Sequence, residues 1–111
     1  MTLKYGFLGG ANLKANQEVS PYQCAPPALA VAFTVSFCNR GVTPAAVFLA
    51  HGTGADSKAA GTLFLEANWI VKPGETRERT GLALNPGRKL FAMSDTDLVD
   101  VEIHGFEKGA V

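Results

Sequence analysis

The sequence predicts an all-β fold, a seven-strand antiparallel β-sandwich (Ig-like or jelly-roll-like) with an extended N-terminal arm. Beyond residue 17 the chain divides into short segments separated by Gly, Pro, Asn or Asp, at a spacing typical of sandwiches and barrels. Residues 29–37 alternate strictly between apolar and small or polar side chains, which is the period of a strand with one buried face. Helix is expected at most as a single turn within residues 55–60.

Length and composition favour one folded domain. The chain has 111 residues, of which 47% are hydrophobic and 18% charged, so it has enough apolar material for a core. We divide it into an arm over residues 1–17, a sandwich domain over 18–107 and a short tail over 108–111. The arm is predicted to be extended because its apolar residues are isolated and its glycines break any sustained period.

The first three strands are expected at residues 18–24, 29–37 and 44–51. The first contains Pro21, so it is either an edge strand or broken at the proline. The second should bury its odd-numbered residues, namely Leu29, Val31, Phe33, Val35 and Phe37. Asn-Arg-Gly at 39–41 supplies residues that tolerate positive φ and therefore predicts a hairpin turn into the third strand.

The last four strands are expected at residues 62–71, 75–84, 89–93 and 98–106. A crossover loop over residues 52–61 leads into the fourth strand, which should bury its odd-numbered residues, Leu63 to Val71, Trp69 among them. Turns rich in Gly, Pro, Asn or Asp separate the remaining strands.

Charge and cysteine content exclude several classes of function. Ten Lys and Arg balance ten Asp and Glu, so the chain lacks the basic field that attracts nucleic acid or an anionic membrane surface. No apolar run is long enough for a signal peptide or a membrane span, and we expect neither secretion nor membrane insertion. Cys24 and Cys38 are poorly placed for a cross-strand disulfide and are predicted to be buried free thiols of a reducing compartment.

No residues are predicted to bind a metal or a cofactor or to catalyse a reaction. His51 and His104, with Asp56, are the natural candidates for a metal site, but no HxH, HExxH or CxxC spacing supports one, which favours surface histidines at strand ends. The glycine-rich residues 51–54 lack the lysine of a phosphate-binding loop. The acidic residues 95–102 lack the spacing of a calcium loop, and turn formation explains them better.

Four phenylalanines fall on strand faces opposite the main apolar stripes: Phe48, Phe64, Phe91 and Phe106. A carbohydrate-binding face needs two or three aromatic rings in a planar row, and here each ring stands alone on its strand. A protein interface, or a core buried on both sides, explains them at least as well.

Taken as a whole, the chain resembles a family of small virion structural proteins of tailed bacteriophages. The resemblance covers nearly the whole chain and is carried by short turn and strand signatures. These are Leu8-Gly9-Gly10, Tyr22 and Pro26, Val35-Ser36-Phe37-Cys38-Asn39-Arg40-Gly41, Thr43-Pro44-Ala45-Ala46-Val47, Pro73-Gly74-Glu75-Thr76 before Gly81-Leu82, and His104-Gly105-Phe106-Glu107. The commoner form of the family has Gln after Leu-Gly, where this chain has Gly10.

The resemblance implies a non-enzymatic component of the phage particle, made in the host cytoplasm and incorporated into the virion in many copies. Our first hypothesis is a capsid decoration or cement protein whose partners are the major capsid protein or other virion subunits, and which forms a homo-oligomer. Its interface candidates are the apolar arm residues Leu3, Tyr5, Phe7 and Leu8. The alternatives are a tail, baseplate or fibre component, then a carbohydrate-binding module, and last an enzyme.

Overall fold

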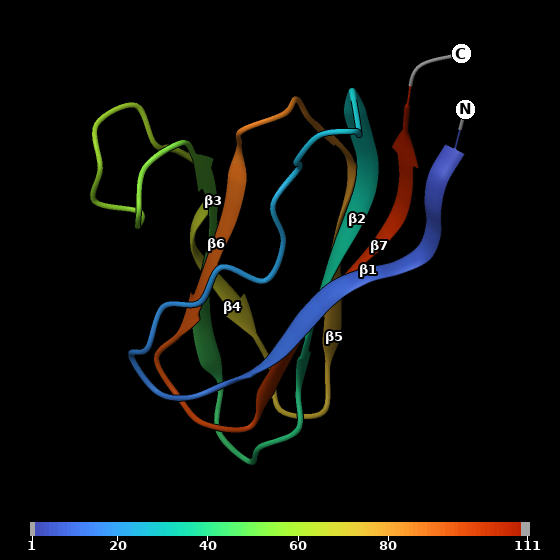
Figure 1. Cartoon of the computed structure of the whole chain (residues 1–111). Helices are drawn as coiled ribbons and strands as arrows, with labels where there is room; N and C mark the ends of the chain where they lie inside the picture. The colour runs from blue at the N-terminus through green and yellow to red at the C-terminus, as the bar shows by residue number, and fades with distance from the viewer. Residues whose placement is uncertain (1, 110–111) are drawn as a thin grey trace.

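Seven strands form two antiparallel sheets that pack face to face in the computed structural model, which describes residues 2–109, with side chains from Lys4 onward (Figure 1). The predicted all-β fold is confirmed. One sheet has four strands in the order β1 (Thr2–Leu13), β7 (Val99–Lys108), β2 (Ala30–Asn39) and β5 (Thr76–Leu84).

The second sheet has three strands, in the order β4 (Leu63–Val71), β3 (Ala45–Gly52) and β6 (Lys89–Ser94). The chain passes from one sheet to the other before β3, after β4, after β5 and after β6, so β4 and β5 follow each other in sequence but belong to different sheets. Residues 55–60, for which at most one helical turn is predicted, contain only turns and bends.

The extended N-terminal arm is not confirmed, because residues 2–13 are strand β1 and pair with β7 along its whole length, from Thr2 opposite Lys108 to Leu13 opposite Val99. Two register shifts interrupt this ladder. Leu8 and Leu13 are both buried although an odd number of positions separates them, so the strand lacks the even spacing of buried residues that sequence patterns detect.

The strand predicted over residues 18–24 is wrong as a regular strand. The segment makes isolated bridges instead, from Val19 to Ala92 and from Gln23 to Lys89. It therefore runs beside the outer edge of β6 without forming a continuous ladder. Pro21, which has no N–H to donate, lies in the middle of it.

The core lies between the two sheets and follows the predicted alternation most closely on β2. Val31, Phe33, Val35 and Phe37 are buried there, whereas Leu29 lies just before the strand and is 58% exposed. The alternation predicted for β4 fails at Leu63 and Ala67, which are exposed. Register shifts between β3 and β4 change which side chains of β4 face inward.

Trp69 packs against the core on the side where β4 and β5 are not joined by a backbone ladder. Its ring contacts that of Phe37 edge to face, with centroids 6.2 Å apart and planes at 82°. Asn39 connects the turn that follows β2 with the end of β4. Its buried amide donates hydrogen bonds to the carbonyl oxygens of Thr43 at 2.8 Å and Val71 at 3.0 Å. A buried amide with these partners fixes the position of β2 relative to β4.

Candidate interaction surface

The four interface candidates of the N-terminal segment have different surroundings. Tyr5 and Phe7 are 86% and 69% exposed, although both are large aromatic residues. Leu8 is buried in the core of the chain itself, so it stabilises the fold and is not available at the surface as an anchor. The side chain of Leu3 lies outside the described part of the structure.

Tyr5 and Phe7 share the outer face of the four-stranded sheet with Phe106. In the ladder between β1 and β7, Tyr5 lies opposite Phe106 and Phe7 lies opposite His104. Because paired residues of neighbouring strands point to the same side, these side chains form one surface. We call Tyr5, Phe7 and Phe106 the aromatic patch; the Phe106 side chain is 43% exposed.

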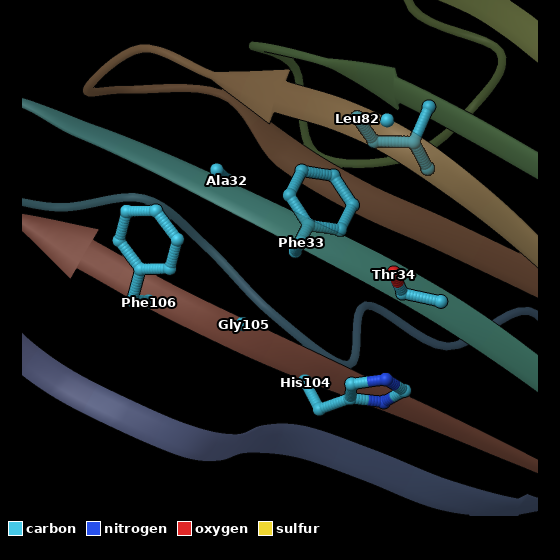
Figure 2. A pocket seen from close by; sticks show the side chains of 8 residues that line it. Ala32, Phe33, Thr34, Leu82, His104, Gly105 and Phe106 are labelled. Carbon is cyan, nitrogen blue, oxygen red and sulfur yellow. The ribbon is translucent and has the colours of Figure 1, made fainter.

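Two of the shallow hollows at the aromatic patch include His104, Gly105 and Phe106. One, of about 270 Å³, extends across β2 to Leu82 on β5, and in it the side chains of His104 and Phe106 stand on either side of Gly105 (Figure 2). The other, of about 300 Å³, extends to Tyr5.

Small residues leave the space that forms these hollows. A Cβ atom at Gly105 would lie 2.1 Å from the carbonyl oxygen of Ala32, so the close approach of β7 to β2 requires glycine there. Opposite Phe106 on β2 stands only the methyl group of Ala32. The Phe106 ring therefore stands above neighbours that have little or no side chain.

The other half of the same sheet face is polar. Arg40 donates two hydrogen bonds to Asp100, at 2.7 and 3.2 Å, and Asn12 donates a third at 2.7 Å. Desolvation by burial acts to raise the pKa of Asp100, but the hydrogen bonds from Arg40 and Asn12 and the charge of Arg40 outweigh it and lower the pKa. The outer face is thus divided into an apolar half and a charged half.

The two histidines lie on different sheets, His51 on β3 and His104 on β7. Nδ1 of His51 accepts a hydrogen bond of 2.8 Å from Arg88, which leaves that nitrogen without a lone pair for a metal. Nδ1 of His104 lies 3.5 Å from Glu102 and makes no hydrogen bond. Nowhere between residues 2 and 109 do three His, Cys, Asp or Glu side chains come together to hold a metal ion.

Cys24 is buried near Tyr22 and Glu107, and the Tyr22 hydroxyl donates a hydrogen bond of 2.6 Å to that carboxylate. Burial first, and then Glu107, raise the pKa of both Tyr22 and Cys24. A protonated thiol at zero exposure is a poor nucleophile. Cys38 is only partly buried because its position on β2 faces outward, and both thiols are free.

The three-stranded sheet carries a second, smaller apolar surface on its outer side. Phe48 and Phe64 pack against each other there with ring centroids 5.2 Å apart and planes at 62°. Phe64 is 49% exposed, whereas Phe91, predicted to lie opposite the apolar stripe of its own strand, is buried. Two steeply inclined rings do not form the flat platform on which a sugar ring stacks, so this pair does not favour a carbohydrate-binding module.

The aromatic patch combines residues about one hundred positions apart, and this is the part of the surface that sequence reasoning missed. Tyr5 and Phe7 are predicted as interface residues of the arm and Phe106 as an outward-facing ring alone on its strand, but only the pairing of β1 with β7 brings the three together. No local pattern in the sequence specifies that pairing.

None of the described residues forms a helix long and apolar enough to cross a membrane. Comparison of the chain with protein-family models, with curated proteins and with solved structures gave no significant match.

Proposed function

We propose that this chain is a non-enzymatic structural protein of a tailed-phage virion, a capsid decoration protein that binds the capsid surface through the aromatic patch. The observation that carries the proposal is the exposure of Tyr5, Phe7 and Phe106 side by side on one sheet face. Clustered exposed aromatic residues are a mark of protein interfaces. The turn and strand signatures shared with small virion proteins supply the class of partner.

The mechanism is burial of apolar surface between the patch and neighbouring capsid subunits. The exposed fractions of the three side chains, 86%, 69% and 43%, amount to about two whole aromatic side chains, or roughly 400 Å². At about 25 cal/mol per Å², burying this area contributes about 10 kcal/mol before the cost of association is subtracted. That cost is of similar size, so a single copy binds weakly. Weak contacts repeated over a regular array suit a decoration protein.

A tail, baseplate or fibre component would use the same surface but in far fewer copies. The number of copies per particle therefore separates the two hypotheses. It is measured by quantitative mass spectrometry of purified particles of the encoding phage, with the major capsid protein as the internal standard. We expect hundreds of copies. A few dozen or fewer would assign the chain to the tail, and its absence from particles would overturn the virion proposal.

A variant pair tests the role of the patch. Tyr5→Lys/Phe7→Lys places two charges where the apolar contact is proposed, and both side chains are exposed, so folding should be unaffected. Val42→Lys is the matched control, because Val42 is 92% exposed but lies in the turn between β2 and β3. We expect the double variant to be lost from particles and the control to be incorporated like the wild-type protein. Equal incorporation of both would exclude the patch as the docking surface.

A further inference from the structure

The four outer edges of the two sheets are protected to different degrees. An edge strand presents unpaired N–H and C=O groups, and proteins usually block such edges with charges, bulges or covering segments. Three of the four edges here are blocked. The fourth, on β1, is the least protected, with one charge near its start and two register shifts.

The edges of β5 and β4 are blocked by arginine side chains. Arg77, Glu78 and Arg79 place charges of both signs along β5. Across the gap between the sheets, Arg77 donates a hydrogen bond to the carbonyl oxygen of Ile70 at 3.1 Å, and Arg79 pairs with Glu66 on β4. These contacts occupy hydrogen-bonding groups that a strand of another molecule would need for pairing.

The edge of β6 is covered by the chain itself. The amide of Val19 donates to the carbonyl oxygen of Ala92, and the amide of Ala92 donates back to Val19, both at 2.9 Å. Further bridges join Ala15 to Ser94 and Gln23 to Lys89. No room for another strand remains along these residues.

The edge of β1 carries one charged residue, Lys4, near its start and two register shifts, but no covering segment within residues 2–109. From Tyr5 to Leu13 the strand has no charged residue. Among the described residues, those of β1 make no backbone hydrogen bond outside the ladder to β7. Over residues 5–13 this edge is therefore both uncharged and uncovered by other described residues, and it borders the aromatic patch.

We propose that β1 pairs antiparallel with β1 of a second copy, about a two-fold axis at Gly6, to form a continuous eight-stranded sheet. A two-fold interface brings each residue next to the axis close to its own copy, so a charge there would be repelled, and β1 has none from Tyr5 onward. Lys4 lies two positions from the axis, where it is opposite Leu8 of the partner subunit and not opposite its own copy. With the axis at Gly6, Tyr5 lies opposite Phe7 of the partner subunit on both sides of the axis. Aromatic cross-strand pairs of this kind stabilise antiparallel strands.

The surface area that stable binding to the capsid requires also favours two copies of the chain. The aromatic patch of one copy exposes roughly 400 Å², about half of the roughly 800 Å² per partner in a stable interface. Edge-to-edge pairing leaves the sheet face open, so it joins two patches into one surface of the required size. In this respect the inference rests on the proposed function, because the enlarged surface is the one proposed to bind the capsid.

The association is measured on the purified full-length protein by sedimentation velocity over a concentration series. We expect a reversible dimer with a dissociation constant in the micromolar range. Tyr5→Lys/Phe7→Lys should be monomeric, since it places like charges beside the axis, while Val42→Lys should dimerise like the wild-type protein. Circular dichroism and thermal unfolding confirm that the variants are folded. A monomeric wild-type protein, or an unchanged dimer in the double variant, would overturn the proposal.

Disulfide trapping tests the register. Tyr5→Cys and Phe7→Cys are made as separate proteins in a Cys38→Ser background, which leaves only the buried Cys24. Opposite positions in an antiparallel pair are close enough for a disulfide, whereas diagonal positions are too far apart. Cross-linking should therefore be strong in the mixture and weak in either protein alone. Equal cross-linking in all three samples would contradict an axis at Gly6.

The two proposals fail separately. A monomer found in hundreds of copies per particle would overturn the pairing of β1 and leave the decoration function standing. A dimer that is absent from particles would overturn the decoration function and leave the pairing of β1 standing.

Discussion

His51 shows how one residue links the fold to pH. It lies in β3, and its Nδ1 accepts a hydrogen bond from Arg88 Nε, so this nitrogen carries no proton in the folded protein. Burial first, and then the positive charge of Arg88, lower the pKa of His51 below its ordinary value of 6.5. Because the unfolded chain binds this proton more tightly than the folded one, the contribution of His51 to stability is fully present above pH 6.5.

We predict that this contribution is lost as the pH falls from 6.5 through the lowered pKa of folded His51. The free energy of unfolding, measured by urea denaturation followed by Trp69 fluorescence, should therefore decrease over this interval. His51→Gln cannot titrate and should show a flatter profile. Arg88→Gln keeps the histidine but removes the neighbouring charge, and its slope should lie between the other two. A His51→Gln slope equal to that of the wild-type protein would contradict the prediction.

Strands β4 and β5 show how an element is held where no backbone ladder exists. They follow each other through the turn at residues 72–75 but diverge into different sheets. Arg77 and Arg79 of β5 reach back to β4, and the guanidinium of Arg77 also lies 4.6 Å from the centre of the Trp69 ring. Side chains thus close the side of the sandwich that the backbone leaves open.

We predict that Arg77→Ala/Arg79→Ala lowers the free energy of unfolding by about 1–2 kcal/mol, because partly exposed ion pairs and cation–π contacts each contribute about 1 kcal/mol. The same variant should aggregate faster, since it uncovers the edge of β4. Urea denaturation measures the first effect and light scattering the second. Lys58→Ala, which removes one exposed positive charge from the loop before β4, is the control and should behave like the wild-type protein in both assays.

The strands themselves differ in how well the sequence predicts them. The residues of β2 alternate without interruption, and six of the seven observed strands fall within about two residues of a predicted one. Strand β1 was missed because its glycines and register shifts break the alternation, although Leu8 and Leu13 are buried as in any other strand. Pro21 predicts either an edge strand or a break within residues 18–24, and the structure shows isolated bridges there instead of a regular strand.

At the scale of the whole molecule, pairing between distant strands decides the surface, and this is what the sequence predicts least. Apolar residues on outward faces were expected, but which of them meet depends on strand order and register. Tyr5 and Phe106 meet because β1 joins β7 and not another strand. Phe91 is buried although its alternation places it outward. Such outcomes depend on contacts between residues far apart in the chain.

The charge balance of the whole molecule predicts how particle binding should respond to salt. Ten basic and ten acidic residues give a net charge of zero, and Tyr5, Phe7 and Phe106 are uncharged. Binding to particles that lack the protein should therefore change less than about threefold between about 0.05 and 0.5 M sodium chloride, because screening has little charge to act on. Sulfate should strengthen it. A steep loss of binding in sodium chloride would show that charged residues dominate the contact.

The pairing of Thr2 with Lys108 has a practical consequence for protein display. The two ends of the described chain emerge side by side next to the aromatic patch, while the loop between β3 and β4 projects beyond the other sheet (Figure 1). A cargo fused at either end would crowd the docking surface. A peptide inserted into residues 53–62 would instead project away from the aromatic patch, so this loop is the suitable site for displaying a foreign peptide.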